Sequence, residues 1–229
     1  MAGWLSYLWY ETVYWACALA LTLGFSLRIE GKRNIPRRGP VLLIANHQSF
    51  LDPVLVGLAT PRQLHFLARQ SLFRHWPLAL LIRSLNAVPI HHEGLGKEGL
   101  KTILEQLRAG RAVVVFPEGT RTPDGAVHPF RAGIQLLIKR VQAPIMPVGI
   151  AGAFEAWPRW SPLPIPAPLF MAARAGSLAV AVGLPLDAKR FVEMSREAAL
   201  TELHLELEKA QRRAEAIRRK PERGSACQR

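Results

Sequence analysis

Short apolar runs recur along this chain and alternate with helical patterns. Three of these runs are rich in β-branched residues and are bounded by turn residues, which predicts buried strands. They are Val41–Ala45, Ala112–Phe116 and Ile145–Ile150. The alternation of strands with helices predicts an α/β fold, with a central, largely parallel sheet flanked by helices.

Weaker patterns complete the predicted domain. Further strands are expected at 26–30, 64–69 and 86–90, and helices at 72–85, 99–107 and 133–141. Pro77 should bend or restart the helix that contains it. The stretch 153–168 holds five prolines and two tryptophans, which predicts a long loop that is buried or faces a membrane. Apolar runs at 169–173 and 178–182 predict a hairpin, and 187–219 has helical spacing with a basic end that is either solvated or lipid-binding.

The longest apolar stretch lies at the start of the chain. Trp4 to Phe25 contains a single charge, at Glu11, and as a helix it would be roughly 33 Å long, close to the hydrocarbon thickness of a bilayer. Three arrangements fit it: a bilayer span, which Glu11 disfavours, a position within one leaflet, or packing in the core. We expect a membrane-associated helix at 1–27, an α/β domain at 28–187, and a C-terminal amphipathic basic helix with its tail at 188–229.

Composition narrows the class of partner. The chain has 229 residues, a net charge of +13 and a hydrophobic fraction of 49%, so we expect a folded protein with anionic partners. Its basic residues are scattered and no nucleic-acid motif is found, so lipid and phosphorylated substrates are expected and nucleic acid is not. Cys17 and Cys227 lie far apart, which predicts neither a disulfide framework nor a metal site.

A histidine and a carboxylate lie where the first buried strand gives way to a helix. His47 and Asp52 follow the strand at 41–45, and Ser49 or Asp52 can cap the next helix. Residues five positions apart do not share a helix face, so the two side chains can meet only if the chain turns between them. The carboxylate would then fix the imidazole tautomer and stabilise its cation, leaving the second ring nitrogen to take a proton from a hydroxyl. In isolation, the pattern also fits a capped helix start with an incidental histidine.

A second polar turn follows the strand at 112–116. Gly119 permits a tight turn with open backbone N–H groups, and Thr120 supplies a hydroxyl. Arg121 offers a fork that binds a phosphate at two points, and Glu118 can hold that arginine or accept from a substrate hydroxyl. Because ligands gather at the carboxyl ends of strands in α/β sheets, both turns are expected to share one cleft.

Together, the H-x-x-x-x-D pattern and the F-P-E-G-T-R turn resemble motifs of the glycerolipid acyltransferase family, which includes the lysophosphatidic acid acyltransferases. The similarity covers about residues 31–183, with weaker matches at 130–133 and 145–150. It implies that His47 is the general base and Asp52 its orienting carboxylate, without a covalent acyl-enzyme.

The resemblance also implies a set of substrate-binding residues. Glu118, Gly119 and Arg121 would bind the acceptor, with Thr120 adding its hydroxyl. Arg69 stands where the family often has lysine, and can share the phosphate. His92 stands where the family has arginine, and as a pH-dependent phosphate ligand it leaves room for a different acceptor.

The implied reaction moves a fatty acyl group from acyl-CoA or acyl carrier protein to the sn-2 hydroxyl of lysophosphatidic acid. It gives phosphatidic acid for phospholipid biosynthesis and uses no other cofactor. We expect the enzyme at the cytoplasmic face of the inner membrane, because basic residues follow the apolar N-terminus. One alternative is another lysolipid acceptor, such as lyso-ornithine lipid. The other is a non-catalytic basic membrane-surface protein, which would not explain two motifs at strand ends.

Overall fold

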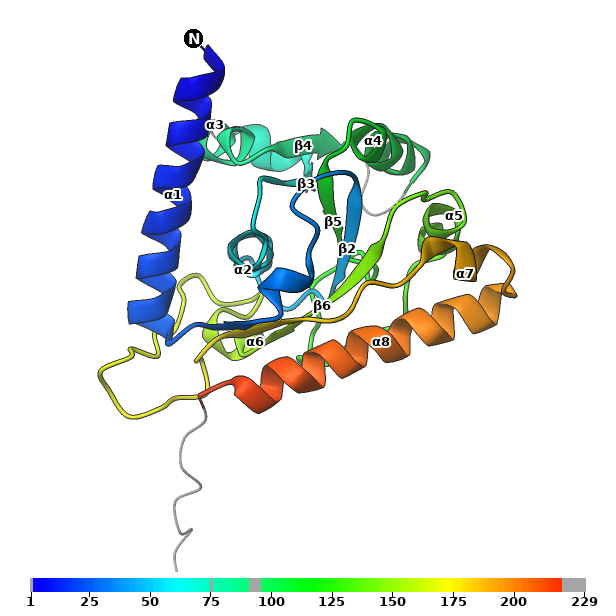
Figure 1. The fold of residues 1–229 in the computed structure, drawn as a ribbon. Coiled ribbons are helices and arrows are strands. Elements are labelled where there is room, and N and C mark those ends of the chain that lie inside the picture. Colours follow the sequence, from blue (N-terminus) through cyan, green and yellow to red (C-terminus); the bar gives the residue numbers. More distant parts are fainter. Residues whose placement is uncertain (1, 75, 91–95, 220–229) are drawn as a thin grey trace, which may run out of the picture.

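A seven-stranded sheet forms the centre of the molecule. The computed structural model describes residues 2–74, 76–90 and 96–219 (Figure 1). The strands are β1 (Arg28–Glu30), β2 (Val41–Ala45), β3 (Leu64–Arg69), β4 (Ala87–Ile90), β5 (Ala112–Val115), β6 (Ile145–Ala151) and β7 (Ala179–Val182). Their order is β1-β7-β6-β2-β5-β3-β4, and every neighbouring pair is parallel except β6 with β7. The predicted α/β fold with a largely parallel sheet is confirmed.

Helices cover both faces of this sheet (Figure 1). They are α1 (Ala2–Phe25), α2 (Asp52–Ala59), α3 (Trp76–Ser84), α4 (Lys97–Arg108), α5 (Gly133–Ile138), α6 (Ala153–Ala156), α7 (Ala188–Val192) and α8 (Arg196–Ile217), with 3₁₀ turns η1 (Lys32–Asn34) and η2 (Gln70–Arg74). α1 and α2 pack on one face, and α4, α5 and α8 pack on the other. The sheet is therefore the middle layer of three.

The central strand β2 is buried on both sides. Leu43 faces the cluster under α1 and α2, whereas Leu42 and Ile44 face the cluster under α4, α5 and α8. All five residues of β2 are fully buried. A strand covered on both faces reads as an unbroken apolar run, which is why its bounds were predictable from the sequence.

Three local predictions were wrong. The stretch 169–173 is not a strand: β7 pairs with β6 and β1, while the Leu169 amide donates to the Leu23 carbonyl at the end of α1. The single helix expected at 187–219 is two helices, because the Ser195 hydroxyl accepts from the Ala198 amide and starts α8 afresh. Neither Ser49 nor Asp52 caps α2, whose N-cap is Leu51 without a side-chain bond. The restart expected at Pro77 is confirmed, since α3 begins at Trp76.

The N-terminal helix α1 packs against α2 along one side only. Tyr10 and Leu21 are buried, and the Tyr14 hydroxyl donates to the Leu58 carbonyl of α2 (3.1 Å). The predicted membrane helix at 1–27 is confirmed only as a helix. Within the described part of the chain, no helix is both long enough and apolar enough to cross a membrane.

The basic end of α8 is bound to the rest of the protein. Arg213 makes two 2.8 Å hydrogen bonds to the Glu30 carboxylate in β1. Arg218 pairs with Glu155, and Arg219 donates to the Leu169 and Met171 carbonyls, both at 2.7 Å. Three arginines of this run therefore fasten α8 to the sheet edge and to the proline-rich loop, a role that neither sequence interpretation included.

Candidate active site

The histidine and carboxylate singled out in the sequence lie in contact at the carboxyl end of β2. The chain turns between Ala45 and Asp52, which brings His47 Nδ1 to 2.7 Å from Asp52 Oδ2. The Asp52 side chain is fully buried, whereas the His47 side chain keeps 20% of its surface exposed. The predicted meeting of these two side chains is confirmed, and the imidazole is the partner that a substrate can reach.

Asp52 also fixes the loop that carries the histidine. Its Oδ2 atom accepts from the backbone amides of Gln48 (2.5 Å) and Ser49 (2.7 Å). Because a carboxylate oxygen receiving these bonds acts as an acceptor, His47 carries its proton on Nδ1. The lone pair on Nε2 is then left to accept a proton from a substrate.

The second predicted turn locks His47 from the neighbouring strand. The Phe116 ring stacks on the imidazole at 4.2 Å with an interplanar angle of 21°. The His47 amide donates to Glu118 Oε1 (2.9 Å), and its carbonyl accepts from the Thr122 amide (2.8 Å). β2 and β5 are parallel neighbours, so the two turns meet at one edge as predicted.

The Glu118 carboxylate points to backbone rather than to Arg121. Its second oxygen accepts from the His128 amide (3.2 Å), and the residue is only 3% exposed. Burial raises the pKa of Glu118 to about 7, against the two amide bonds, which lower it. The prediction that Glu118 holds Arg121 in position was wrong, because both of its oxygens are used to shape the two loops.

Arg121 lies flat against an aromatic ring. Its guanidinium carbon is 3.5 Å from the centre of the Phe50 ring. Gly119 makes the turn before it with a φ of +73°, and a Cβ there would lie 3.0 Å from Arg131 Cγ, so the predicted need for glycine is confirmed. Thr120 is exposed beside them.

Cationic side chains gather around Arg121. Burial and then the nearby charge of Arg69 lower the pKa of Arg121, and Arg159 acts in the same direction. Arg69 ends β3 and is exposed. The third predicted phosphate ligand, His92, lies outside the described residues. Arg159 was not predicted to be part of the site. Its position between Trp157 and Trp160 in the proline-rich loop was the available signal for it.

Two polar side chains that were not assigned a role complete the edge. Asn46 bonds both backbone groups of Ile150, its amide to the carbonyl (2.9 Å) and its oxygen to the N–H (2.8 Å), which joins the histidine loop to β6. His128 Nε2 lies 2.8 Å from Asp124 Oδ1. The spacing rule for helices could not have found this second pair, because residues 124–128 are not helical.

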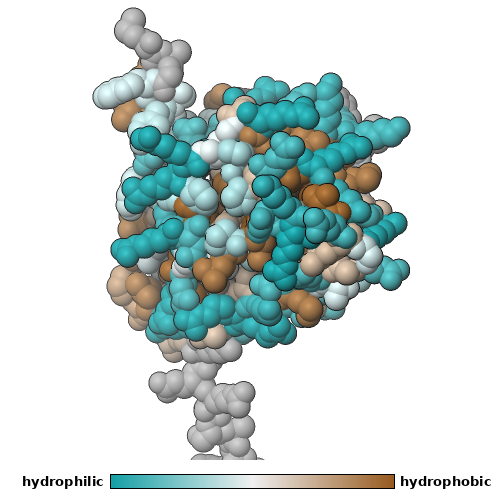
Figure 2. Space-filling model, turned by 45° about the vertical axis from the view of Figure 1, so that its right-hand side comes forward, coloured by the Kyte–Doolittle hydropathy of each residue, from teal (hydrophilic) through white to brown (hydrophobic). Residues whose placement is uncertain are grey.

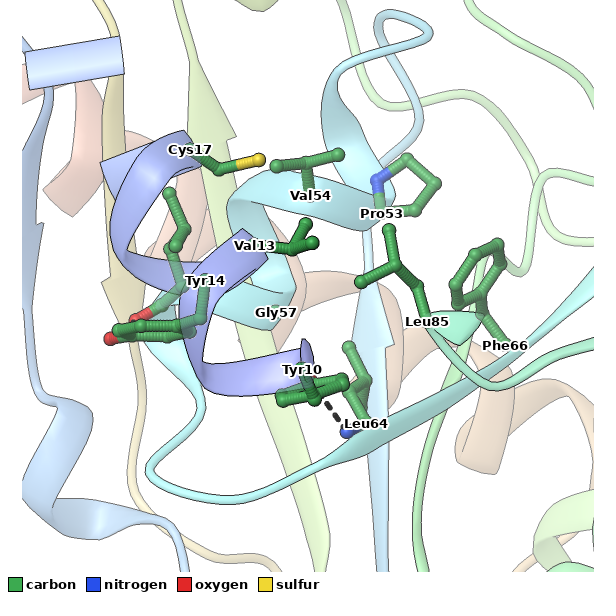
Figure 3. A pocket seen from close by; sticks show the side chains of 11 residues that line it. Tyr10, Val13, Tyr14, Cys17, Pro53, Val54, Gly57, Leu64, Phe66 and Leu85 are labelled. Atoms are coloured by element: carbon green, nitrogen blue, oxygen red, sulfur yellow. Dashed lines mark hydrogen bonds between the residues drawn. The ribbon is translucent and has the colours of Figure 1, made fainter. Parts of the chain in front are cut away.

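An apolar pocket opens beside the histidine loop, between α1, α2 and β3 (Figure 3). Tyr10 and Cys17 reach into it from α1, and Pro53 and Gly57 border it from α2. The Tyr10 hydroxyl accepts from the Leu64 amide at its base (3.2 Å). Pro53, which borders the pocket, directly follows Asp52 in the chain.

Comparison with known proteins matches this arrangement. The model of the Acyltransferase family matches residues 26–151, more than half of the chain. The chain therefore belongs to the Acyltransferase family.

Individual relatives are similar over most of the chain. A 1-acyl-sn-glycerol-3-phosphate acyltransferase of Bacillus subtilis is 27% identical over 83% of this chain and 92% of its own. The crystal structure of the 1-acyl-sn-glycerophosphate (LPA) acyltransferase PlsC from Thermotoga maritima superimposes with a TM-score of 0.73 at 27% identity, covering 91% of this chain and 79% of that one. A lyso-ornithine lipid O-acyltransferase of Pseudomonas aeruginosa is 32% identical over 61% of this chain and 53% of its own.

Proposed function

We propose that this protein transfers a fatty acyl group from a thioester to the free hydroxyl of lysophosphatidic acid. The observation that carries the proposal is the pair of a partly exposed His47 and a buried Asp52 at a sheet edge that also holds the Arg121 guanidinium. A base beside a cation suits an acceptor that has both a hydroxyl and a phosphate.

The chemistry follows from the free nitrogen of His47. Nε2 takes the proton of the acceptor hydroxyl while the oxygen attacks the thioester carbonyl, and Asp52 stabilises the imidazolium that forms. The new C–O bond replaces the C–S bond, and His47 returns the proton to the leaving thiolate. No side chain is acylated in this sequence.

Arg121 is proposed as the principal phosphate ligand. Arg69 and Arg159 add positive charge beside it, and a guanidinium can bind phosphate in two places. Lysophosphatidic acid is the favoured acceptor because it is named for the relatives from B. subtilis and T. maritima. Lyso-ornithine lipid is the second candidate, because the P. aeruginosa relative is named for it.

The apolar surface of the protein supports a membrane-bound substrate. The first exposed group lies on α1: Trp4, Leu5, Tyr7, Leu8, Trp9, Trp15, Leu19 and Leu23. The second lies on the proline-rich loop: Leu163, Ile165, Leu169, Phe170 and Met171. The face turned forward in Figure 2 is, by contrast, mostly hydrophilic. Together these two groups form an apolar flank, which we propose rests on the cytoplasmic face of the inner membrane.

The test is acyl transfer in detergent by the purified full chain. The acyl donor is acyl-CoA or acylated acyl carrier protein with a labelled acyl group, and the acceptor is lysophosphatidic acid or lyso-ornithine lipid. The His47→Ala protein is the negative control. Labelled phosphatidic acid from the wild type alone is the expected result. If only lyso-ornithine lipid is acylated, it is the acceptor in place of lysophosphatidic acid. If the wild type and His47→Ala form equal amounts of product, the proposed mechanism is wrong.

A further inference from the structure

The guanidinium of Arg121 is held by a ring face. Its central carbon lies 3.5 Å from the centre of the Phe50 ring, which is the separation of two planar groups in van der Waals contact. Phe50 lies only three residues after His47, and its side chain remains 47% exposed. One loop therefore carries both the base and the surface on which the arginine lies.

The Phe50 ring is supported from behind. The Trp157 ring lies 5.5 Å from it, tilted by 52°. The Ser49 hydroxyl donates to the Trp157 carbonyl (2.8 Å), which ties the two segments together next to the rings. Phe50 is therefore held in place by packing and by a neighbouring hydrogen bond, so that its position does not depend on a ligand.

Arg121 lacks the carboxylate partner expected for a half-buried arginine. Both Glu118 oxygens receive backbone amides, and Arg121 forms no ion pair within the described residues. Its Nη1 atom is buried there without a hydrogen-bond partner. A carboxylate would pair with the N–H groups that a phosphate needs, whereas an aromatic face leaves those in-plane groups unpaired.

We infer that Phe50, supported by Trp157, is the positioning residue that keeps Arg121 oriented for the phosphate of the acceptor. The inference rests on the proposed function, because it assumes that Arg121 binds that phosphate. Phe50 itself does not touch the reacting atoms. Its loss should weaken recognition of phosphate-bearing acceptors while leaving the His47 chemistry intact.

The experiment compares Phe50→Leu and Phe50→Tyr with the wild type. Phe50→Leu keeps an apolar side chain but removes the ring, so the KM for lysophosphatidic acid should rise roughly three- to thirtyfold with kcat little changed. Phe50→Tyr keeps the ring face and should restore the wild-type KM. Inhibition by sn-glycerol 3-phosphate should weaken in Phe50→Leu by the same factor, whereas the KM for a monoacylglycerol acceptor without phosphate should not move.

Two controls separate this inference from the proposed function. Phe73→Leu removes another ring under an arginine, Arg83 at 5.3 Å, and should leave the KM unchanged. Arg121→Ala tests the proposed function. An unchanged KM for lysophosphatidic acid would show that Arg121 does not bind the phosphate. If Arg121→Ala raises the KM, Phe50→Leu should add nothing further in that background. An unchanged KM in Phe50→Leu alone, or an equal loss for both kinds of acceptor, would overturn the role of Phe50.

Discussion

Two histidine–aspartate pairs lie near the same sheet edge and have nearly the same separation, although His47 uses Nδ1 and His128 uses Nε2. His47 and Asp52 are 2.7 Å apart, and His128 and Asp124 are 2.8 Å apart. The side chains of the first pair are 20% and 0% exposed, and those of the second are 38% and 58% exposed. Distance alone does not distinguish a catalytic pair from a surface one, whereas burial does, because water screens the exposed pair.

The two pairs also differ in what each carboxylate holds. Asp52 receives two amides of the loop that carries its own histidine. Asp124 bonds the Thr122 hydroxyl and an exposed amide, and the bond from His128 is the main reason that its pKa falls to about 2. The first network orients a partly exposed imidazole at the carboxyl end of β2, and the second stabilises a surface turn.

The largest difference is expected from replacing the histidines. His47→Gln should lower kcat by roughly a hundredfold to ten-thousandfold, because it removes the proton acceptor. His128→Gln keeps the amide that bonds Glu118 and should retain most activity. Acyl transfer measured side by side checks this, and a similar loss in both variants would contradict the distinction between the pairs.

The carboxylates provide the next comparison. Asp52→Asn places an amide where one oxygen accepts three hydrogen bonds, so we expect a smaller loss of kcat than for His47→Gln and a fall of about 1–3 kcal/mol in the free energy of unfolding. Asp124→Asn should change both little. Activity assays and denaturant titrations measure the two effects, and an Asp52→Asn protein with wild-type activity would exclude an orienting role for the carboxylate.

The Glu118 carboxylate accepts hydrogen bonds from the backbone amides of His47 and His128. Its ionisation should make the stability of the protein depend on pH. Its pKa rises from 4.5 to about 7 in the folded protein, so the folded state holds the proton more tightly. The free energy of unfolding should therefore fall as pH rises from about 4.5 to about 7, by on the order of 3 kcal/mol.

Glu118→Gln should remove that decline, and urea titrations across this pH range measure it. Asp124 offers the opposite sign, because its pKa is lowered from 3.8 to about 2. The contribution of Asp124 to the free energy of unfolding is fully present above pH 3.8 and is lost only as the pH falls toward 2. If the free energy of unfolding still falls between pH 4.5 and 7 in Glu118→Gln, a group other than Glu118 is responsible for the fall.

The smallest effect is expected on the apolar side of the site. A Cβ at Gly57 meets no atom within 4 Å, so Gly57→Leu should direct its side chain into the pocket of Figure 3. If the acyl chain enters there, the preference for long over short chains should fall roughly tenfold. Gly57→Ala is the control and should change it less; unchanged selectivity in Gly57→Leu would place the chain elsewhere.

The sequence predicted what depends on local pattern. β2 and β3 were predicted residue for residue. β2 is a continuous apolar run because it is buried on both faces, and turn residues mark where the runs begin or end. The meeting of the two polar turns at one edge of the sheet followed from their places after parallel strands. Family resemblance added the roles of these residues, and those roles stay predictions.

What the sequence did not predict depends on contacts between distant segments. β7 pairs with β6 instead of 169–173 because that stretch bonds the end of α1 and Arg219. Glu118 looked like a partner for Arg121 because it lies only three positions before it in the chain. Its actual partners, the amides of His47 and His128, lie on different loops, and no spacing rule gives that arrangement.

The pairing of β1 with β7 also sets the order in which this protein can fold during synthesis. Arg28 lies opposite Ala179, so that edge of the sheet stays open until about 150 further residues have been made, roughly 10–30 s at ribosomal rates. α1 is made before both strands, and the apolar side chains that stay exposed on it in the folded protein are uncovered throughout that interval. A nascent chain that binds a lipid surface early would be shielded from aggregation, and that surface would then act as a folding partner.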